Sequence, residues 1–363
     1  MSDRTSDSQP AAPCILIIKR SSLGDITHAL PVANALRDTY PAAHIAWLVE
    51  SRFAEILDNH PALTEVITIR HCGLGEPLGL IRETARVRAE MLKRRFDWAL
   101  DLQGLLKSAY LLRLSGAQRR IGLAQERREF NQRMCNELAP GPADAHAVLR
   151  CLQMAKHLGC DVSNPRFDLP VEPAARDWAD RILSEADFGG RRPLVGINPA
   201  ASSVHKQWPP DRFAALTDMM PEVSWVILGG PGDVALAQGI AAQTASPHIV
   251  TAGRTDLKQL VALISRLDAL VTADTGPMHV AAALGVPTVA LFGPTNPAYT
   301  GPFGDIHTVI SHIDRCSDRR RSTYCKRTPT CRDYACMNAI TPDEVAAALT
   351  ETIRTHANLS QFP

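Results

Sequence analysis

The chain has 363 residues, which is long for one domain and favours two domains of ordinary size. Its net charge of +1, with 21% charged residues, excludes the strongly basic class of nucleic-acid-binding proteins. No apolar run reaches the roughly 18 residues that span a bilayer, so we expect no transmembrane segment. Residues 1–13 are polar and predict a disordered tail rather than a signal peptide. We therefore expect a cytoplasmic protein whose nine cysteines are mostly thiols.

Short apolar runs alternate with helical patterns along the first half of the chain. This alternation predicts a parallel sheet with helices on both faces, and ligands bind beyond the carboxyl ends of such strands. Asp25, Glu50 and residues 101–103 fall at that edge. The predicted strands are Cys14–Lys19, His44–Val49, Val66–Ile69 and Trp98–Leu102, and the predicted helices are Ile26–Thr39, Leu80–Arg94 and a segment that ends at Leu114.

Two basic stretches, Arg86–Arg95 and Arg119–Arg133, lie in this half. A run of charges is most often a solvated helix face. Because these stretches lie beside the expected site, the alternative is that they bind an anionic acceptor.

Proline- and glycine-rich sequence, DLPVEP at 168–173 and FGGRRP at 188–193, predicts a domain boundary within 165–192. We place an N-terminal domain at 14–178 and a C-terminal domain at 190–363. The alternation of strands and helices then resumes. The predicted elements are strands Pro193–Asn198, Trp225–Leu228 and His248–Val250, and helices Pro210–Met219, one ending near Gln243, and Leu257–Leu267.

The stretch 267–294 reads as one strand–turn–helix–strand unit. We predict strands at Ala269–Ala273 and Thr288–Phe292, and a helix between them that Gly285 ends. The turn at Asp274 would present backbone N–H groups and a helix N-terminus, which suit a phosphate. The alternative is an ordinary turn without a ligand.

Three strand ends converge in this second sheet: residues 200–203 together with Lys206, residues 229–233 and residues 274–279. Their small residues permit close approach of the backbone, and they carry one lysine, two carboxylates and a histidine. This combination suits a nucleotide diphosphate. Neither a GxGxxG nor a GxxxxGK[ST] motif occurs in the chain.

With both halves read, the chain resembles the ADP-heptose:lipopolysaccharide heptosyltransferase family from one end to the other. The matching pieces are KRSSLGDITHALP (19–31), IAWLVE (45–50), DLQGLLKSA (101–109), HKQWP (205–209), ADTGPMHVAAALGVPTVALFGPTNP (273–297) and ITPDEV (340–345). The resemblance implies a GT-B architecture of two doubly wound Rossmann-like α/β domains facing a central cleft. The acceptor would bind in the N-terminal domain and the sugar nucleotide in the C-terminal one.

The resemblance also implies roles for single residues. Asp25 corresponds to the family's catalytic aspartate, and Lys206 to the lysine that contacts the diphosphate. Asp233 falls where relatives place a glutamate that holds the ribose. The other residues expected to bind substrate are Ser202, Ser203, Asp274, Thr275, Gly276, His279, Gln103 and Lys107.

The implied reaction is inverting transfer of a heptose from ADP-heptose to a lipid A–Kdo type acceptor at the inner face of the inner membrane. A carboxylate such as Asp25 can take the proton of the attacking hydroxyl, although an N-cap of the following helix is the other role open to it. No Asp-x-Asp motif occurs, and we expect neither a metal nor another cofactor in catalysis. Two alternatives are a transferase of this family with another acceptor or sugar nucleotide, and a nucleotide-sugar-binding protein without transferase activity.

Four late cysteines, Cys316, Cys325, Cys331 and Cys336, are candidate ligands of a structural zinc or iron ion. Their spacing lacks a CxxC pair, so a loop of unpaired thiols is the alternative. A last helix is predicted over Thr341–Ile353, with Thr341 as its N-cap and Glu344 in the capping-box position.

Overall fold

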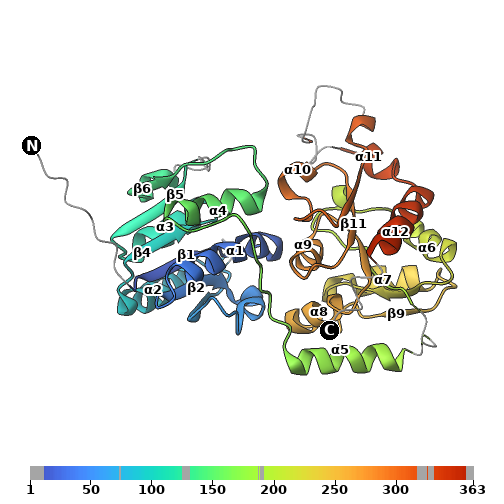
Figure 1. The fold of residues 1–363 in the computed structure, drawn as a ribbon, viewed down its shortest axis with the longest axis horizontal. Helices are drawn as coiled ribbons and strands as arrows, with labels where there is room; N and C mark the ends of the chain where they lie inside the picture. The colour runs from blue at the N-terminus through green and yellow to red at the C-terminus, as the bar shows by residue number, and fades with distance from the viewer. Residues whose placement is uncertain are drawn as a thin grey trace, which may run out of the picture. The chain divides into compact units, whose positions relative to one another are not determined.

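The computed structural model describes residues 12–72, 75–124, 131–186, 188, 192–316, 325 and 331–356. Most of the predicted tail, residues 1–11, lies outside these ranges. The chain divides into two compact units, the first ending at Pro170 and the second beginning at Val171. Figure 1 shows that each unit has its own sheet and its own helices.

The first unit is built on a six-stranded parallel sheet of order β3-β2-β1-β4-β5-β6. The strands are β1 (Cys14–Ile18), β2 (His44–Glu50), β3 (Glu65–Ile69), β4 (Trp98–Asp101), β5 (Arg119–Leu123) and β6 (Glu137–Ala139). The helices are α1 (Leu23–Thr39), α2 (Pro77–Arg94), α3 (Leu106–Leu114) and α4 (Ala147–His157), with 3-10 turns η1 (Ser51–Leu57) and η2 (Asn131–Met134). The strand order reverses between β1 and β4, which is where doubly wound sheets bind ligands.

Helices cover both faces of this sheet, so its central strands are apolar throughout. Helices α2 and α3 contribute Val87, Met91, Leu111 and Leu112 to a core with Leu16 and other strand residues. Helices α1 and α4 pack against each other within this unit (Figure 1).

The second unit repeats this topology in the order β12-β11-β10-β7-β8-β9, again all parallel. The strands are β7 (Leu194–Asn198), β8 (Ser224–Ile227), β9 (His248–Val250), β10 (Ala269–Ala273), β11 (Thr288–Phe292) and β12 (Thr308–Ser311). The helices are α5 (Pro173–Glu185), α6 (Pro210–Met219), α7 (Val234–Ala241), α8 (Leu257–Ile264), α9 (Gly276–Ala283), α10 (Pro297–Thr300), α11 (Ala335–Asn338) and α12 (Pro342–His356). Three 3-10 turns complete it: η3 (Val204–Lys206), η4 (Pro231–Asp233) and η5 (Ile313–Arg315).

One face of this second sheet carries an extensive apolar core. Apolar side chains of α6, α7 and α12, such as Phe213, Ile240 and Leu349, pack with those of β7, β8, β10 and β11. Met278 of α9 packs with Ala290 and Phe292 of β11 in a smaller cluster. The order of the strands reverses between β7 and β10, so the second unit also has one switch point.

The predicted fold class, two doubly wound domains of GT-B type, is confirmed. Several elements differ from the prediction or add to it, among them the unpredicted helices α5, α10 and α11. Helix α1 begins at Leu23 rather than Ile26, and the basic stretch from Arg119 begins as strand β5, so a solvated helix face is wrong there. The rest of that stretch falls partly on 125–130, outside the described residues. Strands β6 and β12 and helix α4 were not predicted from the sequence.

Candidate active site

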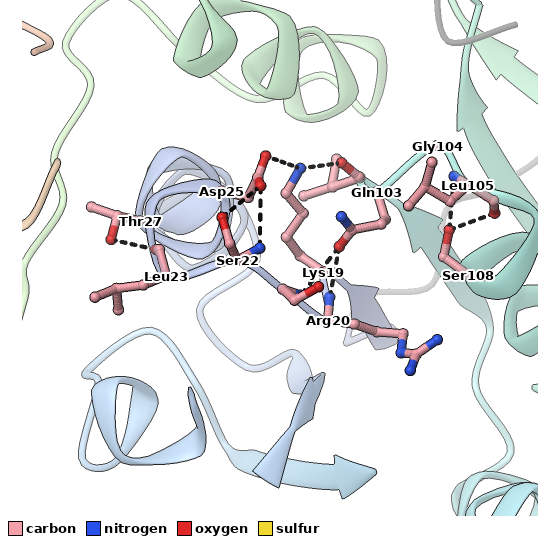
Figure 2. A network of polar contacts seen from close by, with 12 residues as sticks. Lys19, Arg20, Ser22, Leu23, Asp25, Thr27, Gln103, Gly104, Leu105 and Ser108 are labelled. Atoms are coloured by element: carbon pink, nitrogen blue, oxygen red, sulfur yellow. Dashed lines mark hydrogen bonds and ion pairs between the residues drawn. The ribbon is translucent and has the colours of Figure 1, made fainter. Parts of the chain in front are cut away.

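A buried lysine joins the two loops at the switch point of the first unit. The Lys19 Nζ donates to the Leu102 carbonyl oxygen at 2.8 Å and lies 3.4 Å from Oδ1 of Asp25. Figure 2 shows the ammonium between the Asp25 carboxylate and the loop after β4. The Lys19 side chain is 8% exposed and that of Asp25 is 46% exposed. The arrangement therefore fixes a carboxylate that still has nearly half of its surface in solvent.

Asp25 lies in the first turn of α1, whose N-cap is Ser22. Its Oδ2 accepts hydrogen bonds from the Ser22 backbone N–H at 3.1 Å and from the Ser22 hydroxyl at 2.9 Å. Burial by itself would raise the pKa of Asp25, but the Lys19 charge and the bonds from Ser22 outweigh it and lower that pKa. The prediction that Asp25 is the N-cap is therefore wrong, because Ser22 holds that position. Since its pKa is lowered, the Asp25 carboxylate is ionised at neutral pH.

The loop after β4 is held by its own carboxylate. Oδ1 of the buried Asp101 accepts from the backbone N–H groups of Gln103 and Gly104, at 3.0 and 3.1 Å. Burial raises the pKa of Asp101 despite these bonds. The Gln103 amide oxygen accepts in turn from the N–H of Arg20 at 2.9 Å, so it orders the loop after β1. Lys107 lies exposed on α3.

Cations surround Glu50 at the end of the neighbouring strand β2. The Glu50 side chain is 5% exposed, and it is contacted by Arg20 at 3.1 Å, by Arg52 at 2.9 Å and by His71 at 3.4 Å. The Arg20 Nε is buried without a partner among the described residues. A cluster of basic side chains therefore lies at the end of β2, the strand next to β1.

In the second unit, an ion pair joins the loops at the switch point. The Lys206 Nζ donates to Oδ2 of Asp274 at 2.6 Å, and the His279 Nε2 lies 3.8 Å from Oδ1. Burial by itself would raise the pKa of Asp274, but the neighbouring His279 and Lys206 lower it to about 2. The Asp274 side chain is 8% exposed and that of Lys206 is 23% exposed. Here the lysine is the member of the pair with more contact with solvent.

A buried amide fixes the turn that carries Asp274. The Asn198 Nδ2, at the end of β7, lies 3.1 Å from each of three oxygens: the Ala200 carbonyl and the Thr272 and Thr275 hydroxyls. Thr275 is the N-cap of α9, and Gly276 is its first residue. The first turn of that helix therefore lies beside Lys206, and this combination suits an anion.

The loop that carries Lys206 is anchored by Trp208, which is fully buried. Its indole N–H donates to the Ile340 carbonyl oxygen at 3.0 Å, and its ring packs edge-on against Phe213 at 4.7 Å between centroids. The buried Trp208 therefore fixes the backbone of the loop, and with it the position of Lys206.

Comparison with known proteins identifies the family of the chain. The family model of glycosyltransferase family 9 (heptosyltransferase) matches residues 84–328. The lipopolysaccharide heptosyltransferase 1 of Pseudomonas aeruginosa is 30% identical over 359 residues, which cover 92% of this chain and 96% of the relative. The chain belongs to glycosyltransferase family 9.

Further relatives of this glycosyltransferase extend the match. A lipopolysaccharide core heptosyltransferase of Haemophilus influenzae is 26% identical over 83% of this chain and 84% of its own length. The solved structure of E. coli ADP-heptose LPS heptosyltransferase II is 26% identical, with a TM-score of 0.75 over 94% of this chain and 99% of that one. The chain is accordingly a transferase, as the sequence predicts.

The remaining residues predicted to bind substrate in this family 9 enzyme lie in the second unit. Ser203 is the N-cap of η3, and its hydroxyl lies 3.0 Å from the His205 Nδ1. Ser202 is exposed. Oδ2 of Asp233 accepts from the Gly230 N–H at 2.8 Å, so one of its oxygens is already used within the loop after β8. Their contacts with substrate stay predictions.

The four late cysteines, Cys316, Cys325, Cys331 and Cys336, line one small pocket together with His205 and Tyr334. Burial raises the pKa of the Cys336 thiol to about 11. Within the described ranges, no group of three or more histidine, cysteine, aspartate or glutamate side chains is placed to hold a metal ion. A metal at these cysteines therefore stays a sequence prediction.

Sequence reasoning missed the residues that support the two sites. Lys19 and Asn198 stand within or beside recognised motifs, but neither was assigned a role. A lysine directly after an apolar strand in a parallel sheet is a signal that could have been used, because a lysine is rarely buried without a partner.

In the described part of the chain, no helix is long and apolar enough to cross a membrane.

Proposed function

We propose that this enzyme transfers a heptose from ADP-heptose to the inner core of lipopolysaccharide, with inversion at the anomeric carbon and with Asp25 as general base. One observation carries the proposal: each switch point holds an aspartate–lysine pair, and the more exposed member differs between them. It is Asp25 in the first unit and Lys206 in the second.

The first unit would bind the acceptor. An attacking hydroxyl is a poor nucleophile until a base takes its proton as the new bond forms. The Asp25 carboxylate is ionised, held by Ser22 and Lys19, and half open to solvent. The basic group around Glu50 would favour an acceptor with anionic substituents, as expected of a lipid A–Kdo type molecule.

The second unit would bind the sugar nucleotide. The leaving diphosphate gains negative charge as the glycosidic bond to ADP breaks, and fixed cations and N–H groups stabilise that charge. The Lys206 ammonium has three N–H groups, of which the bond to Asp274 takes one. The Thr275 hydroxyl and the first turn of α9 supply further donors. No metal ion is required in this scheme.

The test is turnover with defined substrates. Incubation with ADP-heptose and Kdo-lipid A, or a heptosylated core, should release ADP, and NMR of the product should show the inverted anomeric configuration. ADP release with another acceptor or sugar nucleotide alone would favour a different transferase of the family. Tight ADP-heptose binding with no turnover on any acceptor would support a nucleotide-sugar-binding protein.

A further inference from the structure

Helix α2 has two apolar stripes, although a surface helix needs only one. The inward stripe includes Val87 and Met91, which are fully buried in the core of the first unit. The other stripe faces solvent: Leu78 is 69%, Ile81 64% and Leu92 38% exposed. The core therefore does not account for the second stripe.

The exposed stripe is continuous along the helix. With Leu78 and Ile81 it includes the exposed Ala85 and Ala89, and it ends at Leu92. At about 100° per residue, these five positions fall within an arc of about 80°. The stripe thus runs over nearly the whole length of α2, from its first turn to its last.

Cations border the stripe. Arg82 and Lys93 lie along one side and Arg88 along the other, and all three are exposed. Within the described residues these three form no ion pair, whereas Arg86 is held by Glu83 and Glu90 at 2.6 Å each. The acidic residues of α2 lie away from the stripe, since Glu83 and Glu90 are about 120–140° round the helix from Leu78.

We propose that the outer face of α2, defined by Leu78, Ile81, Ala85, Ala89 and Leu92 with Arg82, Arg88 and Lys93, docks on an anionic phospholipid surface. A helix with an apolar stripe between basic side chains lies in the plane of the membrane interface, where its apolar residues enter the acyl boundary and its cations meet anionic headgroups. The charge of the border selects such a surface over an apolar protein groove.

The purpose of this docking rests on the proposed function, because an acceptor carried on a lipid is found only at a membrane. The docking itself needs no substrate and is measured without one. Failure of either proposal can therefore be told from failure of the other.

The experiment is flotation of the full chain with vesicles at physiological salt. Vesicles of phosphatidylglycerol and phosphatidylethanolamine should bind the protein, and phosphatidylcholine vesicles should bind it at least tenfold less. Leu78→Ser with Ile81→Ser, and separately Arg82→Glu with Lys93→Glu, should each reduce binding to the anionic vesicles at least tenfold. The control is Leu149→Ser on α4, where the leucine is 40% exposed, and it should bind as the unchanged protein does.

Two results would overturn the inference. One is equal vesicle binding by the unchanged protein and both double variants, with thermal unfolding showing that all are folded. The other is a dimer in light scattering that the Leu78→Ser, Ile81→Ser variant disrupts, because the stripe would then cover a second copy. A deacylated, water-soluble acceptor separates the two proposals: the double variants should turn it over normally and lose activity only on vesicle-embedded acceptor.

Discussion

Replacing Asp25 by asparagine separates its proposed role as general base from its part in the capping box of α1. The asparagine side chain has the same shape, and its carbonyl oxygen can still accept from the Ser22 N–H and hydroxyl. Its amide group would lie where the carboxylate oxygen is now 3.4 Å from the Lys19 Nζ, so the ion pair is lost and two donors face each other. The variant therefore keeps the hydrogen bonds from Ser22 but has no carboxylate that could take a proton.

Two losses are expected, one in catalysis and one in stability. Loss of a general base should lower kcat at least about 10²-fold, which corresponds to about 2.7 kcal/mol in the activation barrier. Stability should fall as well, by about 1–3 kcal/mol, because the buried Lys19 ammonium loses its compensating charge and keeps only its bond to the Leu102 carbonyl oxygen. ADP affinity should stay unchanged, since the side chains proposed to bind the diphosphate all lie in the second unit.

The assay is steady-state release of ADP, with urea unfolding and ADP calorimetry on the same preparations. Ser22→Ala is the matched control: it removes the capping hydroxyl, at a cost of about 1 kcal/mol in stability, and leaves the carboxylate in place. Its kcat should fall less than tenfold. If the two variants lose kcat equally, or Asp25→Asn retains kcat within tenfold, Asp25 is not the base.

Three further predictions test the supporting residues. Lys19→Met should raise the pKa of Asp25 and move the acid limb of kcat/KM to higher pH, because the charge that favours the carboxylate is gone; an unmoved limb contradicts this role. Lys206→Met should weaken ADP binding at least tenfold in calorimetry, with the exposed Lys156→Met of α4 as control, and equal affinities would remove Lys206 from the diphosphate site. The lowered pKa of Asp274, about 2 against an ordinary 3.8, should contribute about 2 kcal/mol of stability above pH 4 that is lost as pH falls towards 2. Asp274→Asn should therefore show a shallower fall in unfolding free energy between pH 5 and pH 2.5 than the unchanged protein, and equal slopes would refute the assignment.

The sequence predicts central strands better than edge strands. β10 and β11 are continuous apolar runs bounded by turn residues, and their predicted bounds agree with the structure. The helix between them ends at Ala283 with Leu284 as C-cap, and Gly285 follows with a φ of +70°, which favours glycine. Strand β5, which lies next to the edge strand β6, was missed because Arg119 and Arg120 open it; the Arg119 guanidinium contacts Glu137 of β6 at 2.8 Å. From the sequence alone, these arginines belong to a run of charges, which is typical of a solvated helix face.

The candidate site could be predicted only in part, for a physical reason. Residues at strand ends, such as Asp25 and Asp274, are found because every parallel strand ends at the same edge of its sheet. Which strands adjoin is a property of topology, and the sequence contains no direct record of it. The bond from Lys19 to Leu102 spans 83 positions and that from Asn198 to Thr272 spans 74, so neither partner is visible in a local motif.

The two units have the same topology, and their switch points carry the same two residue types with opposite exposure. In the first, Lys19 is buried and Asp25 is open; in the second, Asp274 is buried and Lys206 is open. A buried charge is costly unless an opposite charge compensates it, so each buried member must hold the exposed one close by. In the proposed reaction, the exposed member would then meet substrate in a fixed place and in its charged form. An open carboxylate suits the removal of a proton, and an open ammonium suits a diphosphate. We infer that the choice of which residue is buried, rather than the fold, assigns each unit its part of the reaction.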